Sequence, residues 1–369
     1  MAQPVAGPGR DAPFPPGRYP VVVVGSGPGG LQTSYSLRRL GVGHAVLSMD
    51  EFPGGMFQRF PLFQRLISWT KPHPPVEDAT KADQWFDWNT LLVDDPAERA
   101  PVWEFMDGTS YFPARSEMEA SLRAFAERAS VPVRFGCRWE ATRQESQGFV
   151  LETSDGEYAC DAIVFAIGMT QPWKPEIEGL DAVPHYADAK PADAYQGKRL
   201  FIIGKRNSGF EVADGLLPSA RQLILGSPSP AKFSVMTRTL VVRARYIQPY
   251  EDYLLAGGVL ILDAAIQRVE RTPGGYRVHT AGTTVPGERA FDVDEAIAAT
   301  GFTAPLGDLP KLGVATFTQG RLPVQTTFWE STTVPGIFFA GSVTQGSAGL
   351  KKFGIGSNSA AVHGFRYNA

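Results

Sequence analysis

A glycine-rich turn near the start of the chain constrains the fold more than any other sequence feature. It reads Gly25-Ser26-Gly27-Pro28-Gly29-Gly30 and follows a short apolar, β-branched run at residues 19–24. Apolar residues at helical spacing follow over residues 31–40, and a second apolar run occupies residues 44–47. Strand, tight turn, helix and strand in this order predict a dinucleotide-binding unit with a pyrophosphate at the helix N-terminus. A turn that only reverses the chain is the alternative interpretation.

The same pattern returns about 180 residues further along. An apolar run at residues 199–204 leads into the turn Gly204-Lys205-Arg206-Asn207-Ser208-Gly209, and a helical pattern at residues 210–217 precedes a short strand at residues 223–225. We therefore expect an α/β fold of two Rossmann-like dinucleotide-binding domains, with the second inserted into the first.

The domain boundaries follow from this duplication. The first domain is expected at residues 19–195 and 291–369, the inserted domain at residues 196–290, and a mobile arm rich in Pro, Gly and Ala at residues 1–18. Apolar strands at residues 295–299 and 336–340 indicate that the chain returns to the first domain. Within that domain, residues 51–111 have a loop-like pattern and residues 117–129 a helical one. Four short strands are expected, at residues 131–135, 138–143, 149–153 and 162–166.

Composition and charge exclude several function classes. A net charge of −3 offers no basic field for nucleic acid or an anionic membrane, and no apolar run approaches the ~20 residues of a membrane span. The N-terminal residues have no apolar core and do not resemble a secretion signal. Cys137 and Cys160 are the only cysteines and lie far apart, which argues against a disulfide framework, a metal site or a CxxC centre and fits the cytoplasm. The oligomeric state is left open, and a homodimer is compatible with the sequence.

An acidic residue is expected about 20 residues after the first turn, where it would hold ribose hydroxyls. Ser48 stands at the end of the second strand, and Asp50 and Glu51 follow it. Either acid can fill the role, and both can equally be solvated loop charges.

Several further motifs resemble those of flavoproteins with two dinucleotide-binding domains. Residues 53–57 are similar to their second flavin loop, residues 59–61 to the Arg-Tyr-Pro of Baeyer–Villiger monooxygenases, and residues 298–302 to the FATGY element of flavin-containing monooxygenases. Residues 162–168 and 334–341 look like the strands by which the chain leaves and closes the flavin domain. The resemblance covers residues 19–366 and implies FAD, reduced by a nicotinamide cofactor. The implied FAD residues are Gly25, Gly27, Pro28, Gly30, Asp50, Glu51, Gly54, Gly55, Met56, Phe57, Arg59, Ala166, Gly168, Gly341 and Ser342.

The second turn occupies the place of the NADPH-binding G-x-G-N-S-G of flavin-containing monooxygenases, and the implied NADPH residues are Gly204, Arg206, Asn207, Ser208 and Gly209. Arg206 replaces the middle glycine. Its side chain can crowd a pyrophosphate or pair with it through the guanidinium. A functional NAD(P)H turn, a vestigial element and a site for another anion all stay open. NADPH is preferred over NADH because Lys232, Arg238, Arg243 and Arg245 follow the next strand, although these bases can also form a solvated face.

The sequence departs from its relatives at three other places. Ser342 stands where many relatives have an Asp that holds the ribityl chain, and its hydroxyl can make one such hydrogen bond. Gly29 replaces the cysteine of the bacillithiol disulfide reductase-like branch, which argues against disulfide reduction by that route. His185 alone survives from the linker of class B monooxygenases and is either a linker residue or a hydrogen-bonded loop residue. A C-terminal helix from about Gly356 is expected to face the flavin or simply to pack.

No Ser-His-Asp set, carboxylate pair or metal-ligand cluster stands out, so the flavin itself is expected to carry the chemistry. Trp69, Lys71 and His73 follow the second flavin loop and are the candidate catalytic or substrate-site residues, with a surface loop as the alternative. The leading hypothesis is a class B-like monooxygenase acting on a small molecule at nitrogen, sulfur or carbon. The alternatives are a reductase without oxygen transfer and a flavin-binding protein that has lost nicotinamide turnover.

Overall fold

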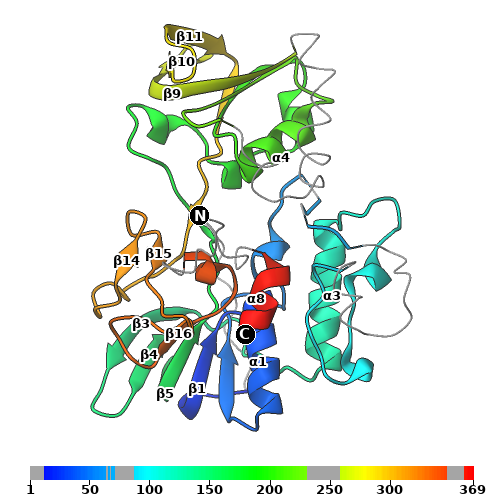
Figure 1. Cartoon of the computed structure of the whole chain (residues 1–369), viewed down its shortest axis with the longest axis vertical. Coiled ribbons are helices and arrows are strands. Elements are labelled where there is room, and N and C mark those ends of the chain that lie inside the picture. Colours follow the sequence, from blue (N-terminus) through cyan, green and yellow to red (C-terminus); the bar gives the residue numbers. More distant parts are fainter. Residues whose placement is uncertain (1–11, 64, 67, 71–86, 231–257, 347–360) are drawn as a thin grey trace. The chain divides into compact units, whose positions relative to one another are not determined.

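The computed structural model describes residues 12–63, 65–66, 68–70, 87–230, 258–346 and 361–369 (Figure 1). The chain forms two compact units. Unit 1 comprises Met1–Arg59, Ser68–Gln171 and Thr303–Ala369, and unit 2 comprises Phe60–Ile67 and Pro172–Phe302. The expected α/β fold of two Rossmann-like domains, one inserted into the other, is confirmed.

Unit 1 is built on a sheet whose described strands run in the order β2-β1-β5-β4-β3, with β16 also pairing with β5. The strands β1, β2, β5 and β16 are parallel, whereas β3 and β4 are antiparallel to their neighbours. Because the parallel strands end at the same edge, this edge collects the loops that follow them. The strands are β1 (Gly17–Val24), β2 (His44–Leu47), β3 (Trp139–Gln144), β4 (Phe149–Thr153), β5 (Gly156–Phe165) and β16 (Ile337–Phe339).

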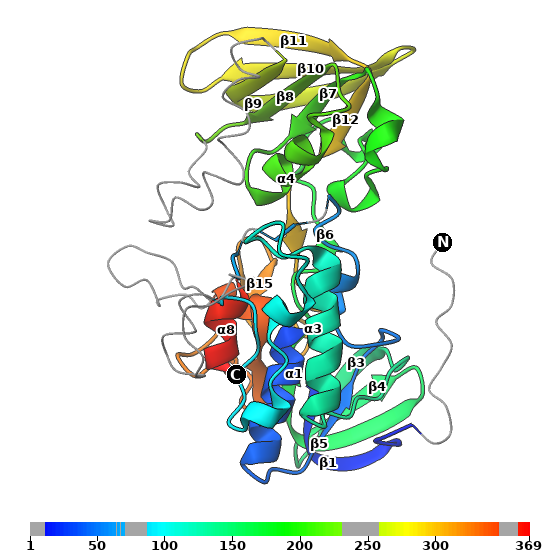
Figure 2. The ribbon, with the colours of Figure 1, turned by 90° about the vertical axis from the view of Figure 1, so that its right-hand side faces the viewer.

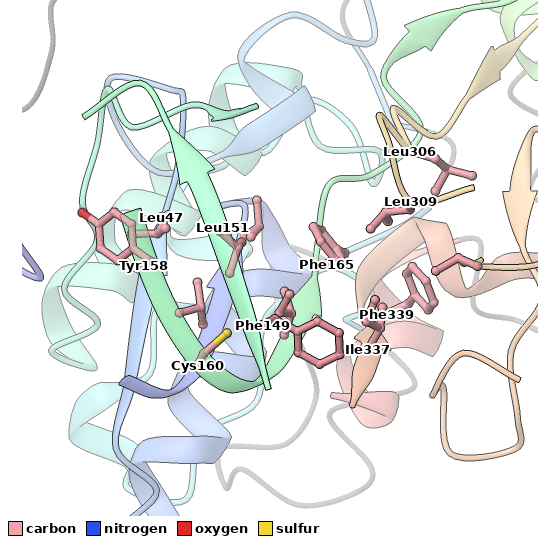
Figure 3. Packing of buried hydrophobic residues seen from close by; sticks show 14 of the residues in the cluster. Leu47, Phe149, Leu151, Tyr158, Cys160, Phe165, Leu306, Leu309, Ile337 and Phe339 are labelled. Carbon is pink, nitrogen blue, oxygen red and sulfur yellow. The ribbon is translucent and has the colours of Figure 1, made fainter. Parts of the chain in front are cut away.

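The core of unit 1 is centred on β5 (Figure 3). Tyr158, Cys160, Ile163 and Phe165 of this strand are fully buried. They pack with Phe149 and Leu151 of β4, Ile337 and Phe339 of β16, and Leu306 and Leu309 of the segment after β13 (Phe302–Thr303). Each fully buried large apolar side chain contributes about 1.5–3 kcal/mol, so β5 is held firmly where its last residue meets the glycine turn.

The remaining elements of unit 1 surround this sheet. Residues 131–135 were expected to form a strand but make only an isolated bridge, Leu47↔Arg134. The loop-like stretch from residue 51 contains short 3-10 helices. The elements are α1 (Pro28–Arg39), η1 (Gly55–Gln58), η2 (Pro96–Glu98), η3 (Val102–Phe105), α3 (Arg115–Arg128), β14 (Thr316–Phe317), β15 (Leu322–Pro323), η8 (Gly341–Gly346) and α8 (Val362–Asn368).

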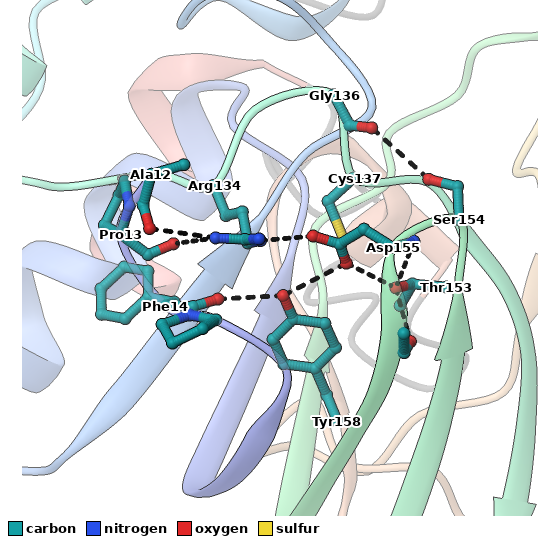
Figure 4. Close-up of polar contacts among 12 residues, drawn as sticks. Ala12, Pro13, Phe14, Arg134, Gly136, Cys137, Thr153, Ser154, Asp155 and Tyr158 are labelled. Carbon is teal, nitrogen blue, oxygen red and sulfur yellow. Dashed lines mark hydrogen bonds and ion pairs between the residues drawn. The ribbon is translucent and has the colours of Figure 1, made fainter. Parts of the chain in front are cut away.

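Residues 12–18 correct the expectation of a mobile arm over residues 1–18, of which residues 1–11 lie outside the described part. β1 already begins at Gly17. Ahead of it, Arg134 Nη1 donates to the carbonyls of Ala12 and Pro13 at 3.0 and 3.1 Å, and the Tyr158 hydroxyl donates to the carbonyl of Phe14 at 2.9 Å (Figure 4). The segment is fixed because a buried polar cluster binds its backbone.

That cluster is organised by the buried ion pair of Arg134 with Asp155. Burial opposes ionisation of Asp155, but hydrogen bonds from Arg134, Cys137 and Thr153 outweigh it, so the pKa of this carboxyl lies below its usual value. The pair therefore stays ionised at neutral pH and joins the N-terminal segment to β4 and β5.

Unit 2 holds a second sheet, with described strands in the order β11-β10-β9-β8-β7-β12 (Figure 2). The strands β12, β7, β8 and β9 are parallel, and β10 and β11 extend the sheet as antiparallel strands. Helix α4 follows β7 and packs against β7 and β8. The elements are η4 (Leu180–Ala182), η5 (Tyr186–Asp188), η6 (Ala192–Tyr195), β7 (Arg199–Ile203), α4 (Asn207–Leu216), β8 (Gln222–Ser227), β9 (Val259–Thr272), β10 (Gly275–Gly282), β11 (Glu288–Val293) and β12 (Glu295–Ala298).

The domain boundaries differ from those expected, 195/196 and 290/291. The chain passes into unit 2 after Gln171 and leaves it after Phe302. The reason is that β12 pairs with β7 in the second sheet, so residues 291–302 belong there. The two passages lie together, since β6 (Gln171–Pro172) and β13 (Phe302–Thr303) form a two-stranded sheet.

Replacing Arg134 with Ala tests the anchor of the N-terminal segment. It leaves Asp155 buried without its cation, and breaking a buried ion pair in this way costs about 3–5 kcal/mol. We expect a loss of that size in the free energy of unfolding, measured by urea denaturation at neutral pH. The loss should shrink at acid pH, because protonation of Asp155 through its depressed native pKa removes the ion pair from the wild-type protein too.

Arg143→Ala is the control, because Arg143 forms exposed pairs with Glu152 and Glu157 on the same sheet. We expect the stability of this variant to stay near that of the wild type. Equal losses in the two variants would refute the anchoring role of Arg134.

Candidate functional site

The first glycine turn closes through backbone packing that leaves no space for side chains at its two ends. Gly25 has a φ of +113°, and a Cβ placed on it would lie 2.5 Å from the carbonyl oxygen of Ala166. A Cβ on Gly30 would lie 1.9 Å from the carbonyl oxygen of Gly25. The Gly25 N–H donates to the carbonyl of Leu47 at 2.7 Å. These contacts bring the ends of β1, β2 and β5 to one point.

Gly27 differs from the two glycines that close the turn. It is the N-cap of α1 with an ordinary φ of −72°, and Pro28 is the first residue of the helix. A Cβ on Gly27 would meet nothing closer than the Cα of Gly55 at 3.8 Å. Internal packing therefore does not require glycine here. A ligand against the first N–H groups of α1 would require it, and this is the fit expected for a pyrophosphate.

The predicted second flavin loop lies directly against the first turn. The Gly54 N–H donates to the carbonyl of Ser26 at 3.0 Å, and a Cβ on Gly55 would lie 2.9 Å from the Cα of Gly27. Gly55 begins η1, which carries Met56 and Phe57. Arg59 follows as an exposed residue. Two loops that are separated in the sequence therefore meet at Gly27.

Asp50, rather than Glu51, is the acid next to the turn. The hydroxyls of Ser26 and Ser48 are 2.8 Å apart, and Ser48 Oγ donates to Asp50 Oδ2 at 3.3 Å. Burial raises the pKa of Asp50, while the charge of Arg59 and hydrogen bonds from the two serines oppose this rise. Glu51 is exposed. The carboxylate is in a position suited to ribose hydroxyls.

The closing segments complete this site. The Ala340 N–H donates to the carbonyl of Phe165 at 3.0 Å, which places Gly341 beside α1. A Cβ on Gly29 would lie 2.5 Å from the Cα of Gly341. A Cβ on Gly168 would lie 3.6 Å from Ser342 Oγ. The structure thus brings the predicted FAD residues together at one edge of the sheet, apart from Glu51 and Arg59, which face solvent.

The second turn in unit 2 repeats this geometry. A Cβ on Gly204, whose φ is +120°, would lie 2.3 Å from the carbonyl oxygen of Ala299, and one on Gly209 would lie 2.2 Å from that of Gly204. Asn207 and Ser208 open α4. Arg206 is the exposed N-cap of this helix, and its side chain makes no ion pair within the described residues. Its guanidinium is therefore available to an anion at the helix N-terminus.

Lys205 is a residue whose role the sequence did not indicate. Its side chain is 1% exposed, and Nζ donates to the carbonyl of Leu262 at 2.6 Å and forms an ion pair with Asp263. Its bond to β9 fixes the second turn on the sheet. No sequence pattern distinguishes such a lysine from a solvated one, because both partners lie 57 or 58 positions away.

Of the remaining candidates, His185 and Trp69 lie within the described residues and the others lie outside them. Buried His185 accepts from the Ala187 N–H through Nδ1 and contacts the Gly301 carbonyl through Nε2 at 2.9 Å. Burial lowers its pKa, so it is a neutral, hydrogen-bonded residue of unit 2. The expected residues Lys71, His73, Lys232, Arg238, Arg243 and Arg245 lie outside the described residues. Gly356 does too, and the described C-terminal helix begins at Val362.

Trp69 belongs to an aromatic cluster, formed with Trp88 and His363, that the sequence did not reveal. Its ring centroid is 4.8 Å from that of Trp88, which is 4.7 Å from the ring of His363 on α8. On the same helix, buried Arg366 donates to the carbonyls of Asp87 and Thr90. Helix α8 packs against α1 and η8, the elements that carry the first turn and Ser342. The aromatic cluster is therefore connected to the predicted flavin residues.

The described residues contain neither a metal-binding cluster nor a membrane-spanning helix. Within the described residues, no group of three or more His, Cys, Asp or Glu side chains could hold a metal ion. None of the described helices is long and apolar enough to cross a membrane.

Comparison with known proteins identifies relatives over most of the chain. Residues 22–341 match the family described as pyridine nucleotide-disulphide oxidoreductase. The "FAD-dependent oxidoreductase domain-containing protein 2" of Mus musculus is 31% identical over 205 residues, which cover 53% of this chain and 30% of that protein. The "Probable indole-3-pyruvate monooxygenase YUCCA9" of Arabidopsis thaliana is 28% identical over 204 residues, 52% of this chain and 43% of that protein. The chain thus spans less than half the length of these two relatives.

Other similarities extend over the whole chain. A "Ferredoxin--NADP reductase" of Salinispora tropica is 27% identical over 356 residues, 93% of this chain and 92% of that protein. The bacillithiol disulfide reductase Bdr (YpdA) of Staphylococcus aureus superposes with a TM-score of 0.71 at 16% identity, covering 95% of each chain. A flavin-containing monooxygenase of Stenotrophomonas maltophilia gives 0.68 at 23% identity, covering 95% and 96%. At these identities the two structures establish a shared fold.

Gly27 and Gly30 provide a matched test of the first turn. Val at position 27 has an allowed backbone conformation, and its Cβ would meet no described atom closer than 3.8 Å, so we expect Gly27→Val to fold but to lose FAD. Val at position 30 would collide with the Gly25 carbonyl, so Gly30→Val should lose the fold itself. Thermal unfolding and the flavin absorbance of the purified proteins distinguish the two outcomes. A Gly27→Val protein with a full complement of FAD would refute this placement of the pyrophosphate.

Proposed function

Because the chain belongs to the pyridine nucleotide-disulphide oxidoreductase family, we propose that it binds FAD, oxidises NADPH and oxygenates a small molecule at nitrogen, sulfur or carbon. The family and its relatives make the chain a flavoprotein oxidoreductase. NADPH and oxygen transfer are the specific parts of the proposal.

The observation that carries this proposal is the state of the thiols. Burial raises the pKa of Cys137 to about 11 and that of Cys160 to about 12, so neither forms a thiolate near neutral pH. They are the only cysteines of the sequence. At the turn, Gly29 lies so close to Gly341 that a cysteine side chain would not fit without a backbone shift. These features argue against the thiol chemistry of a disulfide reductase.

The residues at the first turn suit the parts of FAD. The N-terminus of α1 at Gly27 would receive the pyrophosphate, and Asp50 would accept hydrogen bonds from ribose hydroxyls. Met56 and Phe57 of η1 would lie along the flavin, and Ser342 would offer a hydroxyl to the ribityl chain. When bound, FAD would supply the hydride and electron-transfer chemistry between the nicotinamide and oxygen or another acceptor. The protein would position the cofactor and keep water out.

Support for oxygenation comes from two sequence elements and one relative. The segment at residues 298–302 and the turn residues Asn207, Ser208 and Gly209 resemble those of flavin-containing monooxygenases. The similarity to YUCCA9, which is described as a probable indole-3-pyruvate monooxygenase, also supports oxygenation. An oxygenating site must be dry, and the aromatic cluster of Trp69, Trp88 and His363, joined through α8 to the flavin elements, supplies two indole rings for that purpose.

The second candidate is a reductase that transfers no oxygen. It is favoured by the similarity to a ferredoxin–NADP reductase over 93% of this chain. A third, a flavin-binding protein without nicotinamide turnover, is motivated by Arg206 in place of glycine. Bleaching of the flavin by NADPH under argon separates this third candidate from the two enzymes.

Arg206→Ala tests the role of the second turn. If the guanidinium pairs with a cofactor phosphate, its loss removes a charged hydrogen bond worth about 1.5–3 kcal/mol. We therefore expect weaker binding of NADP⁺, seen as a higher Kd in calorimetry. Arg199→Ala is the control, because it removes the same charge at the opposite end of β7. An unchanged or tighter Kd in Arg206→Ala would show that Arg206 crowds the cofactor instead.

Trp69→Ala tests the oxygenase against the reductase. Opening the aromatic cluster should admit water, so we expect more hydrogen peroxide per NADPH oxidised, at unchanged flavin content. Trp69→Phe keeps an aromatic ring and should stay closer to the wild type. The measurement is the ratio of peroxide to NADPH with amine and sulfide substrates. A wild-type protein that gives stoichiometric peroxide with all of them, yet reduces a ferredoxin or quinone efficiently, is a reductase.

A further inference from the structure

The segment Phe60–Ile67 leaves unit 1 between Arg59 and Ser68 and belongs to unit 2. We call it the excursion. It is separate from the main insertion, Pro172–Phe302, so the chain enters unit 2 twice. A sequence pattern does not reveal it, because it lies within a loop-like stretch.

The first residues of the excursion are held beside the ends of the main insertion. The ring of Phe60 stacks on that of Tyr186 with centroids 5.5 Å apart, and meets the ring of Phe302 edge-on at 5.1 Å. The Leu62 N–H donates to the Tyr186 hydroxyl at 3.1 Å. Phe302 is the last residue of unit 2, so these contacts fix the start of the excursion at the point where the chain leaves that unit.

Helix α4 holds the next residue. The Phe63 N–H donates to Glu211 Oε1 at 2.6 Å, and the Glu211 side chain is buried. One turn further along α4, the Phe63 side chain covers Gly215, where a Cβ would lie 2.4 Å from both Cβ and Cγ of Phe63. Glu211 and Gly215 are four positions apart and so share one face of the helix. This face binds both the backbone and the ring of Phe63.

Both ends of the excursion continue into segments of unit 1 that bear on the flavin site. Upstream, the loop Gly54–Gly55 lies against Ser26 and Gly27. Downstream, Ser68 Oγ donates to Asn89 Oδ1 at 2.5 Å, and the ring of the adjacent Trp69 packs at a tilt against that of Trp88. Along the chain, Phe63 is eight residues from Gly55 and six residues from Trp69.

We propose that Glu211 and Gly215 are positioning residues that couple the N-terminus of α4 to the flavin loops through the excursion. The inference rests on the proposed function, in which a nicotinamide cofactor binds at Arg206, Asn207 and Ser208 at the start of the same helix. Because backbone hydrogen bonds join the first turn of α4 to the turns that follow it, ordering the first turn would order the face that holds Phe63. Occupancy of the second glycine turn would then tighten the loops at Gly55 and Trp69 through the excursion.

Amide hydrogen exchange of a peptide covering residues 60–70 tests this coupling, with FAD-loaded protein in the presence and absence of NADP⁺. Gly215→Ala should displace Phe63 and expose its N–H, so we expect exchange about tenfold faster than in the wild type. Gly274→Ala is the matched control, since a Cβ there meets nothing within 4 Å. NADP⁺ should slow exchange of this peptide in the wild type and the control but not in Gly215→Ala.

Glu211 provides a second pair of variants that does not depend on added volume. Glu211→Ala removes the acceptor of the Phe63 N–H and should speed exchange, whereas Glu211→Gln keeps an oxygen acceptor and should restore slow exchange. Bound FAD, read by its absorbance, should be unchanged in both. A merely structural defect would lower flavin content or speed exchange across unit 2 as a whole.

The outcomes separate the coupling from the proposed function. Exchange of residues 60–70 that is equal in Gly215→Ala, Glu211→Ala and the wild type overturns the positioning role. Equal protection by NADP⁺ in all variants overturns the coupling. Failure of NADP⁺ to bind the wild type in calorimetry overturns nicotinamide binding and the cofactor-driven part of the inference. In that case, faster exchange in the two variants still supports the positioning of the loops by α4.

Discussion

The carbonyl oxygen of Ala166 lies where a side chain on Gly25 would have to be, and that of Ala299 occupies the same place at Gly204. This backbone-to-backbone contact sets the geometry of both units. It forces the chain to turn sharply after the first strand and points the N-terminus of the next helix at the strand edge. In unit 1, the positions of Asp50, Gly55 and Gly341 depend on it, because each of these residues is held against the turn or the strand beside it. The apolar core around β5 holds this strand in place and so stabilises the contact that Ala166, the next residue, makes with Gly25.

The sequence was sufficient for the features that depend on short-range patterns. The two strand–turn–helix units, the meeting of the loop at Gly55 with the first turn, and the convergence of the closing strand all follow from motifs of a few residues. The choice between Asp50 and Glu51 did not follow, because it depends on the hydroxyls of Ser26 and Ser48, which a spacing rule does not see. The domain boundary near residue 291 was wrong for a related reason: a parallel strand such as β12 carries no mark of the sheet it joins.

Long-range polar contacts account for most of the other differences. Arg134, which is paired with Asp155, and Tyr158 bind the carbonyls of residues 12–14, which by composition had been expected to form a mobile arm. Lysine side chains usually lie at the surface, but that of Lys205 is buried beside Asp263. His185 was one candidate for a linker role and proves to be a neutral, saturated hydrogen-bonding residue. In each case the determining partner is distant in sequence or is a backbone group, and backbone groups are the same for every residue type.

The two buried thiols have a consequence for the lifetime of the protein. Oxidation of cysteine proceeds through the thiolate and requires access for the oxidant. With a raised pKa and burial at both positions, Cys137 and Cys160 escape the first step of the oxidation ladder. A flavoprotein that leaks reduced oxygen species at its own centre would thus be spared self-inactivation through its cysteines. Oxidative damage during turnover would then affect other oxidisable side chains, above all those of methionine and tryptophan.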